Sequence, residues 1–430
     1  MAHWDGRAAA ADNIRMFEPQ DVWRRYADEI DGSDGSVRTA GCSVPLNRFL
    51  TNALNATNVL LLTGAGSSFC IQNPAGTKLP AKTAPSLGDL TAAVRAKVGD
   101  TQFNAIIGKI PNGSSITNIE KLLTQCKLYI ALYGTDEGKQ DSIADFIKNA
   151  EIAILERVNF VDAETDLQPH DILLRKLARR GVRKPRAKVF TTNYDLCFEY
   201  SARRLRFVVI DGFSHASPQV YDRSHFSLDI VRRDGPKESP DYLDSVFQLY
   251  KLHGSIDWRR TTSDILRARD GEGSPVLIYP RDSKYQEAFE PPYLDMMATF
   301  QASLREPDTT LIVAGFSFSD SHITSPVLAA LESNMTFRLV ICDPIFLEDA
   351  QVKDDPVVIS GATPTGNEFH KKVQRLAQTG DQRLALLHGR FEDLAIAMPD
   401  LVAETERERH AARVKALREA DPSTSGGMKP

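Results

Sequence analysis

Residues Asn58–Ser68 read NVLLLTGAGSS, and this stretch decides the fold class that we expect for the chain. The run Val59–Leu62 is uniformly apolar, which is typical of a strand buried on both faces of a parallel sheet. The glycines that follow, Gly64 and Gly66, let the backbone turn sharply and approach a pyrophosphate group. The motif lacks the third glycine of the dinucleotide fingerprint, and no Gly-Lys-Ser/Thr follows it. By itself it therefore indicates either a nucleotide-binding turn or a tight strand-to-helix turn.

Short apolar segments follow along the chain and alternate with loops and helices. Helical segments are expected around 283–305 and 321–333, between several of these strands. This alternation, with strands too apolar for one-sided exposure, predicts an α/β fold with a doubly wound, Rossmann-like, mostly parallel sheet. The further predicted strands are Lys188–Thr191, Phe207–Ile210, Val246–Leu252, Val276–Tyr279, Thr310–Ala314 and Phe337–Cys342.

We expect three parts along the chain. An N-terminal arm spans 1–45, and apolar residues at helical spacing predict a helix over 19–30 within it. The sheet domain spans 46–395 and carries a helical insertion over 85–160. The remainder, 396–430, reads as a charged helix followed by a tail without regular structure, because Pro, Ser and Gly dominate its end.

Composition and charge exclude several classes of protein. Of the 430 residues 42% are apolar and 25% are charged, which is typical of a globular chain. No apolar run approaches the roughly 18 residues needed to cross a bilayer, and the first residues do not resemble a secretion signal, so we expect a cytoplasmic protein without membrane attachment. The five cysteines form no C-x-x-C pair, so no metal site is expected.

Direct nucleic-acid binding is not expected either. The net charge of −5 argues against a chain-wide electrostatic attraction to phosphates. One basic cluster is better explained as a solvated helix end; it comprises Arg179, Arg180, Arg183, Lys184, Arg186 and Lys188.

Polar side chains follow several of the predicted strands, where ligands of parallel sheets bind. Thr192, Asn193 and Asp195 follow one strand, and the Asn193 amide can hold a ribose hydroxyl and a water together because it both donates and accepts. His253 directly follows the predicted strand Val246–Leu252. Its imidazole suits base chemistry near neutral pH. The alternatives are that Asn193 and Asp195 cap a turn or helix and that the histidine is structural.

Two more strands end in the same way. Gly315, Ser317 and Asp320 follow the strand Thr310–Ala314, and Asp343 follows Phe337–Cys342. Small hydroxylated residues can donate to phosphate oxygens, and a carboxylate at a strand end can accept from ribose hydroxyls. The alternative readings are a helix N-cap and an Asp-Pro turn.

The ordered set GAGSS, TTNYD, KLHGSIDW, GFSFSD and ICDP resembles the sirtuin-like domain, and more narrowly its bacterial branch of NAD-consuming antiphage effectors. The resemblance implies that the first turn holds the NAD pyrophosphate, that Asn193 positions the nicotinamide ribose and a water, and that His253 acts as base. Asp195 would be the third catalytic residue, orienting the ribose. The implied cofactor-binding residues are Gly64, Ala65, Gly66, Ser67, Thr192, Gly315, Ser317, Asp320 and Asp343.

The chain departs from the protein-deacylating sirtuins in lacking their paired zinc cysteines and the motif that follows their first glycine turn. An NAD site without an acyl acceptor would let water attack the glycosidic carbon. The resemblance therefore implies an NAD⁺ hydrolase that uses NAD as substrate and releases nicotinamide and ADP-ribose. The alternatives are an NAD-dependent protein deacylase or ADP-ribosyl-transferase, and a non-catalytic nucleotide sensor.

Related effectors form homo-oligomers and act with a second protein, so the resemblance also implies a gated activity in antiphage defence. The expected partners are further copies of the chain and a separately encoded protein such as a HerA-type ATPase. Segments 19–30 and 401–419 are candidate contact surfaces, although packing on their own domain explains them equally well.

Overall fold

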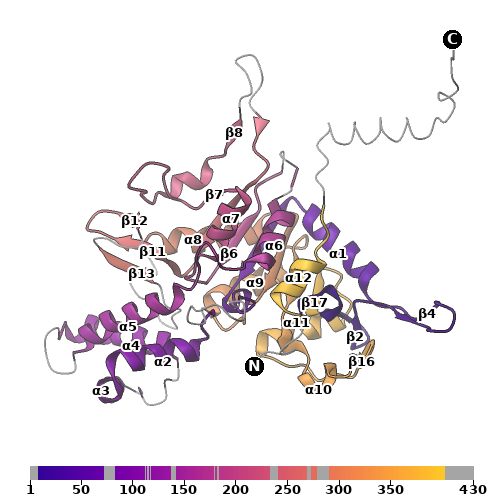
Figure 1. The fold of residues 1–430 in the computed structure, drawn as a ribbon, viewed down its shortest axis with the longest axis horizontal. Coiled ribbons are helices and arrows are strands. Elements are labelled where there is room, and N and C mark those ends of the chain that lie inside the picture. Colours follow the sequence, from indigo (N-terminus) through magenta and orange to yellow (C-terminus); the bar gives the residue numbers. More distant parts are fainter. Residues whose placement is uncertain are drawn as a thin grey trace, which may run out of the picture.

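The computed structural model describes residues 8–71, 83–136, 142–232, 241–277 and 290–401, except for positions 112, 114, 115, 117, 179, 182, 183 and 269–272 within these ranges. Among the described residues, a ten-stranded sheet runs through the molecule in the order β16-β2-β1-β17-β15-β14-β5-β6-β10-β7 (Figure 1). The segment from β17 to β7 in this order is parallel. Its strands are β5 (Asn58–Thr63), β6 (Lys188–Thr191), β7 (Val208–Ile210), β10 (Val246–Lys251), β14 (Thr309–Ala314), β15 (Arg338–Cys342) and β17 (Leu384–His388).

The strand order confirms the predicted doubly wound fold. From β5 the chain builds β6, β7 and β10 on one side, and it then returns to place β14, β15 and β17 on the other side. The order therefore reverses between β5 and β14, which is the topological switch point where ligands of such sheets bind. Strand β17 was not among the predicted strands, because a short buried apolar run cannot be told from a buried helix segment by periodicity.

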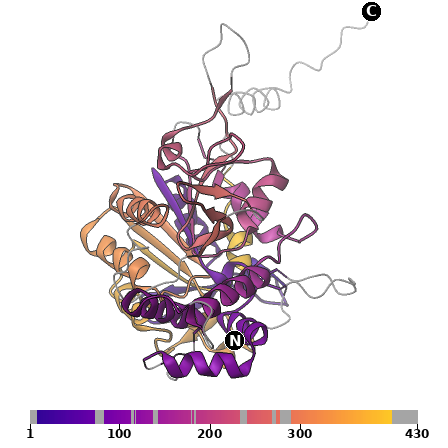
Figure 2. The ribbon, with the colours of Figure 1, turned by 90° about the vertical axis from the view of Figure 1, so that its left-hand side faces the viewer.

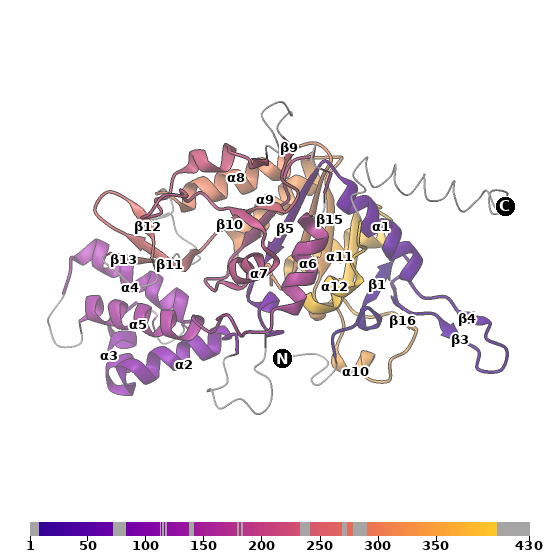
Figure 3. The same cartoon turned by 45° about the horizontal axis from the view of Figure 1, so that its top comes forward.

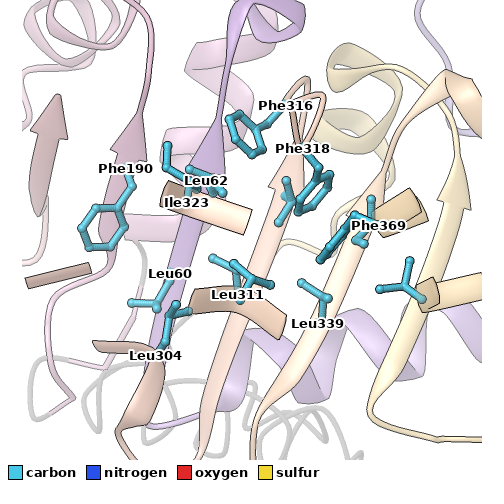
Figure 4. Packing of buried hydrophobic residues seen from close by; sticks show 14 of the residues in the cluster. Leu60, Leu62, Phe190, Leu304, Leu311, Phe316, Phe318, Ile323, Leu339 and Phe369 are labelled. Carbon is cyan, nitrogen blue, oxygen red and sulfur yellow. The ribbon is translucent and has the colours of Figure 1, made fainter. Parts of the chain in front are cut away.

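Helices cover both faces of the sheet, as uniformly apolar strands require. On one face Leu60 and Leu62 pack in a cluster with Leu304, Ile323 and Phe369, which come from three different helices (Figure 4). On the other face Val59 and Leu61 pack against a second set of helices. The first set is α8 (Tyr293–Arg305), α9 (Ser321–Ser333) and α11 (Glu368–Gln378); the second is α1 (Ser43–Asn55), α6 (Gln168–Ala178), α7 (Cys197–Leu205) and α12 (Phe391–Ala397).

The predicted helix over 19–30 is wrong. This segment contains β2 (Val22–Arg25), which pairs antiparallel with β1 (Arg15–Glu18) and with β16 (Val358–Ser360) and extends the sheet beyond β17. Trp23 is fully buried and its ring contacts those of Phe17 and Phe346. The Phe346 ring and strand β16 come from distant parts of the chain, and these contacts override a local pattern that suited a helix. The strands β3 (Glu29–Ile30) and β4 (Val37–Thr39) then form a projecting hairpin (Figure 3).

The described part of segment 85–160, where a helical insertion is predicted, is largely helical. It contains α2 (Leu87–Val98), α3 (Asp100–Lys109), α4 (Ile119–Tyr133) and α5 (Ile143–Val158), which Figures 1 and 2 show as one group at an end of the molecule. The four helices share a core, and that core also includes Tyr194, Leu196 and Ile256 from the sheet domain. The insertion therefore packs directly on the segments that follow β6 and β10.

Smaller elements complete the described part of the chain. A three-stranded sheet has the order β12-β11-β13, and a two-stranded ribbon pairs β8 with β9. The bounds of these and of the short helices are β8 (Val231–Arg232), β9 (Asp241–Tyr242), β11 (Gly254–Arg260), β12 (Ile265–Arg267), β13 (Ser274–Leu277), α10 (Asp349–Val352), η1 (Ala11–Asn13), η2 (Ala65–Ser67), η4 (Arg223–Ser227) and η6 (Pro344–Phe346).

Some predictions fall partly or wholly on residues that the structure does not describe. The charged helix over 401–419 and the tail lie outside the described residues, except for residue 401, as do the last two residues of the predicted strand Val276–Tyr279. Of the basic cluster, Arg180 and Lys184 donate to backbone carbonyls at the end of α1 and beyond it, so these two cations serve as a helix C-cap. Within the described ranges, no helix combines the length and the apolar character needed to cross a membrane.

One buried histidine couples the stability of this fold to pH. His170 on α6 is fully buried between the rings of Phe198 and Phe391, and neither ring nitrogen has a hydrogen-bond partner among the described residues. Burial lowers the pKa of His170 to about 4. The unfolded chain, in which a histidine has its ordinary pKa of about 6.5, therefore binds this proton more tightly than the folded chain does.

We predict that the free energy of unfolding falls as the pH is lowered from about 6.5 towards 4, because protonation of His170 favours the unfolded state. The difference between a pKa of 6.5 and one of about 4 corresponds to roughly 3 kcal/mol. Urea unfolding across this pH range should show a weaker pH dependence in His170→Leu than in the original chain. His215→Leu, at an exposed position, is the matched control. Parallel curves for His170→Leu and the original chain would contradict the prediction.

Candidate functional site

The turn after β5 and the loop after β14 meet through their backbones at the switch point. The N–H of Gly66 donates to the carbonyl oxygen of Gly315 at 2.9 Å. A Cβ atom on Gly66 would lie 2.6 Å from the Gly315 Cα, and one on Gly315 would lie 2.3 Å from the Ser67 nitrogen. Gly315 also has a φ of +69°, which favours glycine. These glycines are therefore required by the contact between the two loops, whatever ligand they also approach.

The residues of this first turn differ in exposure. Ala65 is exposed and Gly66 half-buried, while Ser67 is buried and its hydroxyl donates to the carbonyl oxygen of Gly64 at 2.8 Å. Of the predicted pyrophosphate-binding residues, Ala65 and Gly66 are thus the ones that a ligand can reach directly. Ser67 and Gly64 are buried beneath the exposed part of the turn.

Asn193 lies two residues beyond β6 and joins this turn. Its Nδ2 donates to the hydroxyl oxygens of Ser67 at 3.2 Å and Ser68 at 2.9 Å. The Ser68 hydroxyl in turn donates to Asp195 Oδ2 at 2.8 Å. Because the only proton of Ser68 is directed at the carboxylate, its oxygen must accept from Asn193, and this fixes which way the Asn193 amide points. Within the described part of the chain, the Asn193 Oδ1 has no hydrogen-bond donor and can accept one from a ligand or a water.

Asp195 lies at the predicted edge of the sheet, but its carboxylate oxygens accept hydrogen bonds from within the chain. Its carboxylate is buried, and its second oxygen accepts from the N–H of Cys197 at 3.1 Å, at the start of α7. Both carboxylate oxygens of Asp195 therefore accept hydrogen bonds from groups of this chain. The contacts indicate that Asp195 orients Ser68, and through it Asn193.

His253 lies beside Asn193 at the ends of two adjacent strands. Thr191 of β6 is in register with Lys251 of β10, and each of the two side chains follows two residues later. The His253 Nε2 lies 3.1 Å from Asp320 Oδ2, and both side chains are 7% exposed. The other Asp320 oxygen accepts from the N–H of His322 at 2.9 Å and so caps α9.

This pairing has two consequences. Burial alone would raise the pKa of Asp320, but the hydrogen bond and charge of His253 hold that pKa below its usual value. An ionised Asp320 keeps a proton on Nε2 of the neutral imidazole, which leaves Nδ1 as the basic nitrogen. Asp320 was predicted to bind cofactor; its contacts instead make it the partner that orients His253.

The remaining predicted residues lie along the same edge. The N–H of Thr192 donates to the Thr63 carbonyl oxygen at 3.1 Å. Ser317 is exposed, and its hydroxyl lies 2.8 Å from that of Ser319. Asp343 Oδ1 accepts from the N–H of Ile345 at 2.8 Å, so this carboxylate partly serves as the cap of an Asp-Pro turn.

Sequence reasoning missed two residues that shape the site. Glu120, on the first turn of insertion helix α4, accepts from the Tyr194 hydroxyl at 2.9 Å. Asn367, the N-cap of α11, donates to the carbonyl oxygens of Ser317 and Phe318 and holds the loop after β14. Asn367 lies in no motif, and Glu120 carries only capping-box spacing from Thr117, which indicates the start of a helix and not a contact with the site.

Taken together, the edge presents an oriented amide, an imidazole with its carboxylate, exposed backbone and hydroxyls. This set can hold a polar, hydroxylated ligand and remove a proton from it or from a water. Among the residues that the structure describes, no group of three or more His, Cys, Asp or Glu side chains could hold a metal ion.

Part of the chain is similar to a known protein family. Residues 187–341 match a family model described as SIR2-like domain, and the matched part contains Asn193, His253 and Asp320. Two solved structures are similar at 13% sequence identity, with TM-scores of 0.34 and 0.32. Both are mutants of a Sir2 homologue in complex with ADP-ribose, and each match covers 77% of this chain and 96% of the other. No curated protein matches the chain.

We predict that Gly315→Ala destabilises the protein by about 2 kcal/mol or more, because the new methyl group would clash with the backbone of Ser67 and stand at an unfavourable φ. Thermal and urea unfolding would measure the change. The matched control is Gly108→Ala on α3, where nothing lies within 4 Å of the added carbon. This control should be neutral or stabilising by about 0.5–1 kcal/mol. Equal stability of the two variants would contradict the role given to the loop contact.

Proposed function

We propose that this chain is an NAD⁺ hydrolase, which cleaves NAD to nicotinamide and ADP-ribose. The observation that carries the proposal is the position of Asn193 and His253, side by side at adjacent strand ends within the segment that matches the SIR2-like domain. The strand ends adjoin the switch-point turn, where a dinucleotide binds in doubly wound sheets. NAD is the substrate that this combination supports best.

The chemistry follows from the residues at this edge. Nicotinamide is cationic in NAD, so it leaves the ribose without a general acid, and the glycosidic carbon becomes oxocarbenium-like as it does in other glycosides. The chain must then orient the ribose and one water and take up one proton. The free Asn193 Oδ1 suits the first task, and the imidazole of His253, held by Asp320, suits the second.

The fit to the dinucleotide rests on the contacts of this edge. Ala65 and Gly66 present backbone at the start of the switch-point turn, which is where a pyrophosphate would lie. Thr63, directly before that turn, has a buried hydroxyl oxygen without a hydrogen-bond partner among the described residues. Ser317 and Asp343 follow the next two strands and would face the adenosine half of the substrate.

We predict that His253→Ala and Asn193→Ala lower the rate of NAD hydrolysis by about 10²–10⁴-fold, because each removes a group that acts on the sugar or the water. Release of nicotinamide and ADP-ribose from NAD, resolved by chromatography, measures the effect. Asn52→Ala on the exposed face of α1 is the control and should keep full activity. Circular dichroism and the melting temperature would establish that both site variants fold. A folded variant with undiminished turnover would refute the assignment.

The products also separate hydrolysis from the alternatives. The purified chain would be incubated with NAD and an acyl-lysine peptide. Free ADP-ribose supports hydrolysis, O-acyl-ADP-ribose would make the chain a deacylase, and ADP-ribosylated protein would make it a transferase. NAD that binds without being consumed would point to a sensor.

We further propose that the activity belongs to antiphage defence and is gated by assembly, because unrestrained NAD loss would harm the host. Copies of this chain and a separately encoded protein such as a HerA-type ATPase are the proposed partners. Of the candidate contact segments, 22–25 is part of the main sheet, whereas the exposed Ile30 and Val37 lie on the projecting β3–β4 hairpin.

Light scattering of the original chain and of a variant with Ile30 and Val37 replaced by Ser would measure the size of the oligomer. The rate of NAD loss with and without the partner protein would measure the gating.

A further inference from the structure

One buried carboxylate near the site belongs to the helical insertion and has no place in the chemistry described above. Glu120 lies in the first turn of α4, where Asn118 caps the helix by accepting from the Glu120 N–H at 2.8 Å. The residue is 8% exposed. A buried carboxylate is unusual unless a partner requires it, because burial disfavours its charge.

The partners of Glu120 belong to the site. Its Oε1 accepts from the Tyr194 hydroxyl at 2.9 Å, and Tyr194 stands between Asn193 and Asp195 in the chain. The centroid of the Tyr194 ring lies 6.5 Å from that of His253. The Tyr194 carbonyl oxygen also accepts from the N–H of Ile256 at 3.1 Å, which ties the segment after β6 to the one that carries His253. Glu120 thus reaches both segments through one tyrosine.

The charge of Glu120 also links it to His253. Burial raises the pKa of Glu120, while attraction to His253 and the Tyr194 hydrogen bond act in the opposite direction. Asp320 at the start of α9 pairs with His253, the Tyr194 ring lies near the imidazole, and the charge of Glu120 on α4 interacts with it, while His322 adjoins Asp320. Two carboxylates from different parts of the chain, Asp320 and Glu120, therefore interact with the imidazole of His253.

We propose that Glu120 is a positioning residue for His253, so that the helical insertion takes part in the base chemistry of the site. The inference rests on the proposed function and deepens it. Glu120 favours the imidazolium that forms when His253 takes up a proton, and Tyr194 holds the carboxylate in place. The insertion and the base are then coupled, because any shift of α4 moves a charge relative to His253.

The test is an NMR titration of the histidine rings in the full chain. The original chain has nine histidines, and a His253→Gln sample identifies the signal of His253 by its absence. Glu120→Gln keeps the shape of the side chain and removes its charge, so His253 should lose its proton at a pH lower by at least about half a unit. Glu156→Gln on α5 is the matched control, since that carboxylate is more than half exposed and bonded to Lys97. An unchanged His253 titration in folded Glu120→Gln would overturn the proposal.

A second variant covers the case in which Glu120→Gln does not fold. Tyr194→Phe removes the hydroxyl that donates to Glu120, which should make the carboxylate harder to ionise and move the His253 titration in the same direction by a smaller amount. An unmoved titration in this variant would overturn the proposal on its own.

Measuring the activity of the same variant separates this inference from the proposed function. In Glu120→Gln, the acidic limb of the pH–rate profile for NAD hydrolysis should move to lower pH together with the His253 titration. A lower rate with an unmoved limb would show a merely structural role and overturn the proposal. If the original chain consumes no NAD, the proposed function fails, while the NMR titration still decides the coupling between Glu120 and His253.

Discussion

The contact between the turn after β5 and the loop after β14 is the constraint on which the site depends. Two strands that lie side by side in the sheet, and far apart in the chain, end in loops that approach within backbone contact. Only glycine fits at Gly66 and Gly315, since a methyl group at either position would overlap the other loop. The first loop then places Ser67 and Ser68 under Asn193, and the second carries Asp320 to His253. The two halves of the site are thus aligned by one backbone contact.

The site is built as two short hydrogen-bond chains that fix proton positions before any ligand binds. One runs from Asn193 through Ser68 to Asp195, and the other from His253 to Asp320. In each chain a buried carboxylate lies at the far end and directs the group nearer the edge. Groups oriented in advance need no rearrangement during the reaction, which is the main way in which a polar site lowers a barrier.

The sequence predicted those features that local pattern determines. The apolar runs of β5 and β14 predicted buried parallel strands, and the polar residues after them indicated the edge of the sheet where a ligand would bind. Features that depend on distant contacts were not predictable in this way: β2 suits a helix by its local spacing, and its pairing with β16 leaves no trace in that part of the sequence. For the same reason Asp195 and Asp320 were found at the right edge but given ligand contacts, whereas their carboxylates are bonded within the chain. Glu120 comes from an insertion whose docking no motif specifies.

The pairing of β1 with β17 has a consequence for how the protein is made. Arg15 lies opposite His388, so β1 joins the sheet only after the chain has been translated as far as β17. Trp23, whose ring contacts those of Phe346 and His388, cannot be fully buried before that point. The parallel strands around β5 and β14 can assemble earlier, but the finished sheet is a late product of synthesis.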